Sequence, residues 1–152
     1  MVKSLILVAN ARRARFFERD GAGSDLTELA TFVHPQARHS GRPAAGDASG
    51  DAGKGHGRTA HSGTQFEPRT SVRMAERREF ARILAKYLND AVAGRKCDSV
   101  ALIASGPLLG ELRASLGAAA RKMLKVSVPS DLTRLQGREL TARVDSAMAL
   151  PD

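Results

Sequence analysis

Apolar and polar positions divide the chain into two patterned regions with a long polar stretch between them. The first region opens with a continuous run of Leu, Ile and Val, which is typical of a central strand buried on both faces. In the next segment Phe16 and Phe17 are adjacent, so a strand would place them on opposite faces of a sheet. A turn signal at residues 20–23 precedes a third segment, whose Thr and Glu positions indicate one less buried face. The predicted strands are Lys3–Asn10, Ala14–Arg19 and Leu26–Val33.

The most regular helical pattern of the chain follows the polar stretch. Its large apolar residues recur at intervals of three and four, which places them on one face of a helix. Gly94 then supplies a C-terminal stop. We expect this helix, Ser71–Ala93, to form a main wall of the core. The residues of its predicted buried face are Phe80, Ile83, Leu84, Tyr87, Leu88, Ala91 and Val92.

Strands and helices alternate in the rest of the chain. A fully apolar run predicts a strand at Ser99–Ala104, and Ser105 with Pro107 marks the start of a helix with a leucine stripe. A further strand is predicted at Met123–Val128, and a last amphipathic helix at 140–148.

The predicted order is β-β-β, long loop, α-β-α-β-α. Three strands in succession imply an antiparallel meander, whereas strands that alternate with helices imply parallel crossovers. We therefore predict an α/β fold, in the broad sense that includes α+β, built on a mixed five-stranded sheet with helices packed on it. The strands at 3–10 and 99–104 should lie in its centre. At 152 residues the chain, 1–152, fits a single domain.

The polar stretch from His34 to Thr70 offers a core very little to bury. It contains all four histidines and seven of the 14 glycines, and its one large apolar side chain is Phe66. Burying so little cannot offset the cost of ordering the backbone, about 1–2 kcal/mol per residue. We predict a long flexible loop over 34–70, inserted between the third strand and the long helix. Loops of this length in small domains are often functional.

The histidines of this loop do not indicate a metal site. They form two pairs, His34 with His39 and His56 with His61, each at a spacing of five instead of the four of a helical metal pair. No cysteine or carboxylate cluster accompanies them. We interpret them as solvated loop residues, and we predict neither a metal nor a cofactor.

Sequence signatures of the common enzyme classes are missing. The chain has no GxSxG motif, no Walker loop and no GxGxxG that opens a helix after a strand. Cys97 precedes an apolar strand and is interpreted as a small buried residue. These observations favour a binding protein over an enzyme and leave both open.

The chain is strongly basic, with a net charge of +8 and a pI near 10.5. Such a charge favours a polyanionic partner, namely nucleic acid, the ribosome or an anionic membrane surface. The alternative is that arginine simply replaces lysine on a solvated surface. The longest apolar run near the N-terminus, Leu5–Ala9, is too short for a signal peptide core or a membrane span. With a single cysteine, an internal disulfide is excluded, and we expect a cytoplasmic protein without membrane insertion.

Arginines recur every four residues where the loop enters the long helix. Like charges at this spacing repel by about 0.2–0.5 kcal/mol per pair, and cations at a helix N-terminus oppose the macrodipole. A bound anion would remove both costs. The alternative is that Glu76 and Glu79 neutralise this face. The predicted anion- or RNA-binding residues are Arg38, Arg42, Lys54, Arg58, Arg69, Arg73, Arg77 and Arg78.

Five segments together resemble one bacterial family. They are VANARRARFFE (Val8–Glu18), HPQARHSGR (His34–Arg42), EFARILAKYL (Glu79–Leu88), CDSVALIASGPLLGELRASL (Cys97–Leu116) and SDLTRL (Ser130–Leu135). In this order they resemble the host attachment proteins, which are named as proteins required for attachment to host cells. The likeness covers nearly the whole chain, although Ser130 stands where family members often carry Lys.

The family is in turn similar to the middle domain of eukaryotic and archaeal class I peptide-chain release factors, which implies an RNase H-like or ribosomal-protein-like topology. In those factors a Gly-Gly-Gln loop precedes a long basic helix, and its Gln supports water attack on the peptidyl-tRNA ester. Here Gly63-Thr64-Gln65 precedes the basic helix, so the resemblance makes Gln65 a candidate catalytic residue. Thr64 lacks the backbone freedom of the second glycine.

These observations lead to three functional hypotheses. The first is a release-factor-like module that binds RNA or the ribosome through the basic loop and the start of the helix. The second is a regulatory factor that acts through a protein partner and so gives rise to the attachment phenotype. The third is a peptidyl-tRNA ester hydrolase that uses Gln65.

Overall fold

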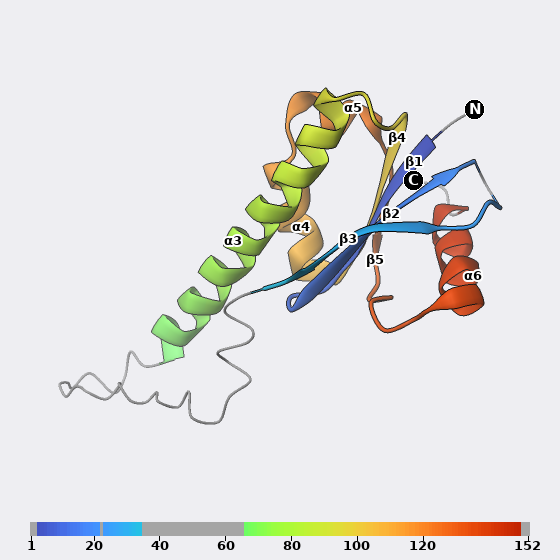
Figure 1. Cartoon of the computed structure of the whole chain (residues 1–152). Coiled ribbons are helices and arrows are strands. Elements are labelled where there is room, and N and C mark those ends of the chain that lie inside the picture. The colour runs from blue at the N-terminus through green and yellow to red at the C-terminus, as the bar shows by residue number, and fades with distance from the viewer. Residues whose placement is uncertain (1–2, 22, 35–65, 150–152) are drawn as a thin grey trace.

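The computed structural model describes residues 3–21, 23–34 and 66–149, with the backbone alone over 66–70. Within these ranges the strands assemble into one five-stranded sheet in the order β3-β2-β1-β4-β5 (Figure 1). The predicted mixed five-stranded sheet of an α/β fold is confirmed. The strands are β1 Lys3–Ala9, β2 Arg13–Asp20, β3 Thr27–Val33, β4 Ser99–Ala104 and β5 Leu124–Pro129.

The pairing of the strands also follows the prediction. β1 pairs antiparallel with β2, and β2 pairs antiparallel with β3, so the first three strands form a meander. β4 pairs in parallel with both β1 and β5. β1 is therefore the central strand, and its alternate residues enter two separate cores. Leu5 and Leu7 point into one core, and Ile6 and Val8 into the other.

The helices of the described residues cover both faces of this sheet (Figure 1). The first core lies under α3, α4 and α5, and the second lies under α6. Phe16 enters the first core, where its ring stacks on Tyr87 at 4.2 Å between centroids, and Phe17 enters the second. The two rings face opposite sides, as predicted. The helices are α3 Phe66–Ala93, α4 Gly106–Ser115, α5 Ala118–Met123 and α6 Gly137–Met148.

A buried arginine fastens α6 to the sheet. The side chain of Arg19 in β2 is only 3% exposed and forms an ion pair with Asp145 of α6. Its guanidinium also donates a hydrogen bond to Met148 Sδ at 3.3 Å. A charge this deeply buried needs such partners, because leaving it unpaired would cost several kcal/mol.

The long helix begins earlier than its apolar pattern predicts. α3 starts at Phe66 and not at Ser71, so the predicted loop over 34–70 ends at least five residues too late. The first turn contains Glu67 and Pro68. Proline is tolerated there because the first helical N–H groups have no intrahelical acceptor, and the helix dipole favours an acidic residue at this end.

Two further predictions about the helices need correction. The short helix α5 was not predicted, because its segment AAARKM has high helix propensity but buries only Ala120 and so shows no apolar periodicity. Ile83 was placed on the buried face of α3, but it is 37% exposed. The neighbouring Leu84, at 0%, occupies the centre of that face instead.

Much of α3 extends beyond the sheet (Figure 1). A helix of 28 residues is about 42 Å long, whereas the seven residues of β1 span only about 23 Å. No residue between 71 and 79 is buried, and the buried residues of the helix begin at Phe80. Residues 71–79 therefore lie outside the core, and we call them the projecting part of α3.

Candidate anion-binding surfaces at the carboxyl edge of the sheet

Four strands point their carboxyl ends toward the same edge of the sheet. β3 runs parallel to β1 because both are antiparallel to β2, and β4 and β5 are parallel to β1. The first residues beyond these strands are Asn10, His34, Ser105 and Ser130. Ligands of open α/β sheets bind outside the carboxyl ends of the strands. This carboxyl edge is therefore where we look for a site.

The side chain of Asn10 joins two distant segments at this edge. Its Oδ1 accepts hydrogen bonds from the backbone N–H groups of Arg12 at 2.8 Å and Arg13 at 2.9 Å. Its Nδ2 donates to Asp131 Oδ2 and to Thr133 Oγ1, both at 3.0 Å. One amide thus fixes the β1–β2 turn and ties it to the loop that follows β5.

Arg15 of β2 fixes the same loop from the sheet. Its NH1 donates to the carbonyl oxygens of Thr133 at 3.3 Å and Leu135 at 2.8 Å, the two residues on either side of Arg134. Its Nε and NH2 both contact the carboxylate of Glu28 at 3.2 Å, in a bidentate pair. This pairing is the strongest geometry available to arginine, and it holds the guanidinium in one place.

Two carboxyl groups of this hydrogen-bond network have lowered pKa values. The hydrogen bond from Arg15 lowers the pKa of Glu28 against the opposing effect of burial. For Asp131, burial raises the pKa, but hydrogen bonds from Thr133 and Asn10 and the charge of Arg134 together outweigh it and lower the pKa. Both carboxylates are thus ionised well below neutral pH and already occupied by partners.

His34 is not the solvated loop residue that its sequence context predicts. Its side chain is 2% exposed, and its ring packs on Phe80 at 4.8 Å between centroids. Nε2 forms a hydrogen bond of 2.7 Å with the carbonyl oxygen of Glu76 in α3, and its backbone N–H donates to Arg12 O at 2.9 Å. His34 therefore connects the β1–β2 turn to the projecting part of α3.

Three of the predicted anion-binding arginines lie on that projecting part. The side chains of Arg73 and Arg78 are exposed, and that of Arg77 is half-buried. Arg78 Nε lies 3.4 Å from Glu111 Oε2 of α4, which is a partner that the sequence did not predict. Arg69 belongs to α3 as well, but its side chain lies outside the described residues.

The alternative of a face neutralised by its own glutamates is not supported by the described contacts. Neither Glu76 nor Glu79 forms an ion pair with Arg73, Arg77 or Arg78 in the part of the chain that the structure describes. Arg77 Nε is buried and donates no hydrogen bond within that part. The positive charge of this surface is therefore only partly compensated.

The other predicted site residues cannot be placed. Arg38, Arg42, Lys54, Arg58 and Gln65 lie outside the described residues, and their roles in anion binding or ester hydrolysis stay predictions.

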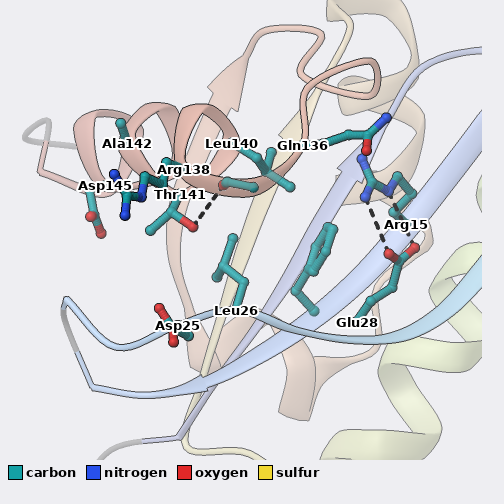
Figure 2. A pocket seen from close by; sticks show the side chains of 12 residues that line it. Arg15, Asp25, Leu26, Glu28, Gln136, Arg138, Leu140, Thr141, Ala142 and Asp145 are labelled. Atoms are coloured by element: carbon teal, nitrogen blue, oxygen red, sulfur yellow. Dashed lines mark hydrogen bonds and ion pairs between the residues drawn. The ribbon is translucent and has the colours of Figure 1, made fainter.

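A groove of about 680 Å³ lies between α6 and strands β2 and β3 (Figure 2). Arg15 and Glu28 stand at one end of it, and Asp145 stands at the other. Leu26 and Leu140 face each other across its middle (Figure 2). This arrangement suits binding more than catalysis, because none of its lining residues is a nucleophile beside a general base.

A cysteine nucleophile and a metal-binding cluster both lack support in the described residues. Cys97 is 6% exposed, and burial, followed by the charge of Asp98, raises the pKa of its thiol. A thiolate nucleophile requires the opposite shift. No three His, Cys, Asp or Glu side chains in the described ranges are grouped so that they could hold a metal ion. In the same ranges, no helix has the length and apolarity needed to cross a membrane.

Sequence reasoning predicted the basic face of α3 but missed Asn10, Asp131 and Thr133. A usable signal was present, because each lies just beyond an apolar strand, and such positions share one edge when the strands are parallel.

Comparison with known proteins identifies the family of the chain. No curated protein matches it. The family model described as "Protein required for attachment to host cells" matches residues 5–144, which includes β1 from its third residue on, all of β2 to β5, and the first two thirds of α6. The chain therefore belongs to the family of proteins required for attachment to host cells.

Proposed function

We propose that this host attachment family protein is a module that binds a polyanion, RNA or the ribosome, through the projecting part of α3. The observation that supports the proposal is the set of Arg73, Arg77 and Arg78 on a helical segment that buries no residue in the core. Uncompensated charge on such a segment comes at a cost in stability. A ligand that neutralises the charge offsets this cost.

The electrostatic cost can be estimated. α3 contains six basic and four acidic residues, and three of the basic ones lie within one and a half turns of each other. Arg73 and Arg77 are four residues apart and repel by about 0.2–0.5 kcal/mol. Arg78 is partly neutralised by Glu111. Phosphate groups spaced along a nucleic acid would contact such a row of guanidinium groups in succession.

The family name then describes an indirect effect. A protein that binds RNA or the ribosome can change host attachment by changing which proteins a cell makes. The likeness to release-factor middle domains supports a translational role, and it stays part of this proposal.

Binding of a single-stranded RNA, measured by fluorescence anisotropy over a range of salt concentrations, tests the proposal. The triple change Arg73→Gln, Arg77→Gln, Arg78→Gln should lower the slope of log K against log salt by about 0.7 for each phosphate group that the variant no longer binds. A matched control removes three exposed charges outside the projecting part of α3, namely Lys122→Gln, Lys125→Gln and Arg143→Gln. Equal losses in both triple variants, or no binding of the wild type at low salt, would refute it. Co-sedimentation with ribosomes under the same salt series extends the test to the larger partner.

A second candidate function is binding of a protein partner, for which β3 provides the surface. β3 is an edge strand, and its Leu29 and Val33 are 42% and 40% exposed. The opposite edge strand, β5, is protected by Lys125 and Pro129, whereas β3 contains neither lysine nor proline. A partner that is recovered with the protein after nuclease treatment, and is lost on Val33→Lys, would favour this function over RNA binding.

A further inference from the structure

A second basic site lies at the carboxyl edge, on the face of the sheet opposite to α3. It is a hollow of about 400 Å³ between the ends of β2 and β3 and the loop that joins β5 to α6. Arg13, Arg15 and Phe17 are spaced two residues apart along β2 and therefore share one face of the sheet, and Phe17 packs in the core under α6. The hollow therefore opens on the α6 side. Its lining residues are Arg13, Arg15, Thr31, Thr133, Arg134 and Gln136.

This hollow is held in shape by the network at the carboxyl edge. Arg15 donates hydrogen bonds to the carbonyl groups on both sides of Arg134, and it forms an ion pair with Glu28. Thr133 is 2% exposed and receives the hydrogen bond from Asn10. The backbone that presents Arg134 is thus fixed at two neighbouring residues, as a preorganised binding site requires.

Positive charge in the hollow exceeds what its own carboxylates neutralise. Both oxygens of Glu28 bind Arg15, and one also accepts from Thr31 Oγ1 at 2.7 Å. Asp131 is occupied by hydrogen bonds from Asn10 and Thr133. Among the described residues, Arg13 and Arg134 form no ion pair, although both line the same hollow.

We propose that this hollow binds the phosphate group of a phosphate monoester. Arg13 and Arg134 would each donate charge-assisted hydrogen bonds to the dianion, and arginine is well suited to this because its planar fork matches phosphate geometry. Arg15 is already bonded to Glu28 and to the carbonyl groups on either side of Arg134, so its role is to position Arg134 and the walls of the site.

The groove beside α6 gives the site room for the organic part of the ester. Arg15 and Gln136 line both the hollow and the groove, so the two spaces adjoin each other. Farther from the hollow, the groove is lined by Asp25 and Asp145, with Thr141 between them and the apolar centre (Figure 2). Asp145 is paired with Arg19, whereas Asp25 has no ion pair among the described residues, so it disfavours a second phosphate and can accept hydrogen bonds from hydroxyl groups. A sugar phosphate, or the 5′-phosphorylated end of an RNA, has this chemistry.

Isothermal titration calorimetry of the full chain with ribose 5-phosphate, ribose and inorganic phosphate tests the proposal. We expect ribose 5-phosphate to bind, ribose not to bind, and inorganic phosphate to bind more weakly than the ester. Arg13→Gln and Arg134→Gln should each weaken binding of the ester by about tenfold or more, which is the loss expected for one charge-assisted hydrogen bond. Both side chains are exposed, so the variants should fold, and circular dichroism checks that they do.

The controls separate this site from the projecting part of α3. Arg143→Gln, on the exposed side of α6, and the triple α3 variant should both keep the affinity for ribose 5-phosphate. The proposal is overturned if ribose 5-phosphate does not bind at millimolar concentration, if Arg13→Gln and Arg134→Gln leave its affinity unchanged, or if inorganic phosphate binds as tightly. Competition by a 5′-phosphorylated oligonucleotide, but not by its 5′-hydroxyl form, would identify an RNA end as the source of the phosphate. No competition by either would identify a small phosphate ester.

Discussion

Replacing Asn10 by alanine should be far more costly than its half-buried position at the end of a strand suggests. The change removes two hydrogen bonds that order the β1–β2 turn and two that hold the loop after β5. Arg12, Arg13 and Asp131 are exposed residues, so we expect water to replace the missing amide at their hydrogen-bonding groups, at about 0.5 kcal/mol each. Thr133 is buried, so loss of the hydrogen bond to its Oγ1 should cost about 1 kcal/mol. We expect a total loss of about 2–3 kcal/mol in the free energy of unfolding.

Asn89→Ala provides a matched control. Asn89 in α3 is half-buried like Asn10, but it makes a single hydrogen bond, from the Gly117 N–H at 3.0 Å. Its replacement should cost about 0.5–1.5 kcal/mol. Urea denaturation followed by circular dichroism measures both variants, and an unchanged m-value would show that neither alters the denatured state. Equal losses of stability in the two variants would refute the claim that Asn10 holds the edge together.

Asn10→Asp sharpens the test through its dependence on pH. One oxygen of the new carboxylate can still accept the hydrogen bonds of the turn. The other oxygen faces the carboxylate of Asp131, to which Asn10 Nδ2 donates a hydrogen bond in the wild type. Two facing carboxylates raise the pKa of one of them in the folded state. Such a group stabilises the fold below its unfolded pKa, near 4, and loses this contribution as pH rises through the folded value. The wild type should behave in the opposite way, because the pKa of its Asp131 is lowered and its contribution is lost as pH falls. If the stability of Asn10→Asp does not recover relative to the wild type on acidification, the assigned contact is wrong.

Two more predictions test the packing of α3 and the burial of the Cys97 thiol. Leu84→Ala should lower the free energy of unfolding by about 2–5 kcal/mol because Leu84 is fully buried, whereas Ile83→Ala, at a position 37% exposed, should lower it by less than about 1 kcal/mol. Similar losses of stability for the two variants in urea denaturation would mean that α3 is rotated about its axis. Because burial and Asp98 raise the pKa of Cys97, its thiol should react with a disulfide reagent at pH 8 at least about ten times more slowly in the folded protein than in urea, and equal rates would contradict the burial.

The strands and the central places of β1 and β4 in the sheet could be predicted because each depends on a local pattern. The apolar runs of β1 and β4 indicate burial on both faces, and only central strands have that environment. The adjacent Phe16 and Phe17 likewise predict two cores by the alternation of side chains along a strand. α5 was missed for the same reason, since Ala118–Met123 has propensity but no pattern.

The candidate sites were only partly predictable. The arginines on α3 follow a regular spacing in the sequence, so their clustering could be predicted. Asn10 and Asp131 are 121 positions apart, and nothing periodic in the sequence connects them. His34 was misinterpreted because its acceptor, the carbonyl of Glu76, lies 42 positions away on an element whose start was itself predicted too late. Contacts of this kind are set by the topology of the sheet and not by local composition.

The two basic surfaces differ in how the fold positions them, and this difference makes their functions separable. Arg73 and Arg78 are exposed on a helical segment that buries no residue in the core, so a flexible polyanion could reach them from several directions. Arg134 is presented by a loop held by Arg15 and Asn10, which suits one small anion in one orientation. The hydrogen bond between His34 and Glu76 joins the strand meander to α3. The two surfaces therefore lie at the same edge of the sheet, but they have no side chain in common. If both proposals hold, loss of charge on one surface should therefore leave binding at the other intact.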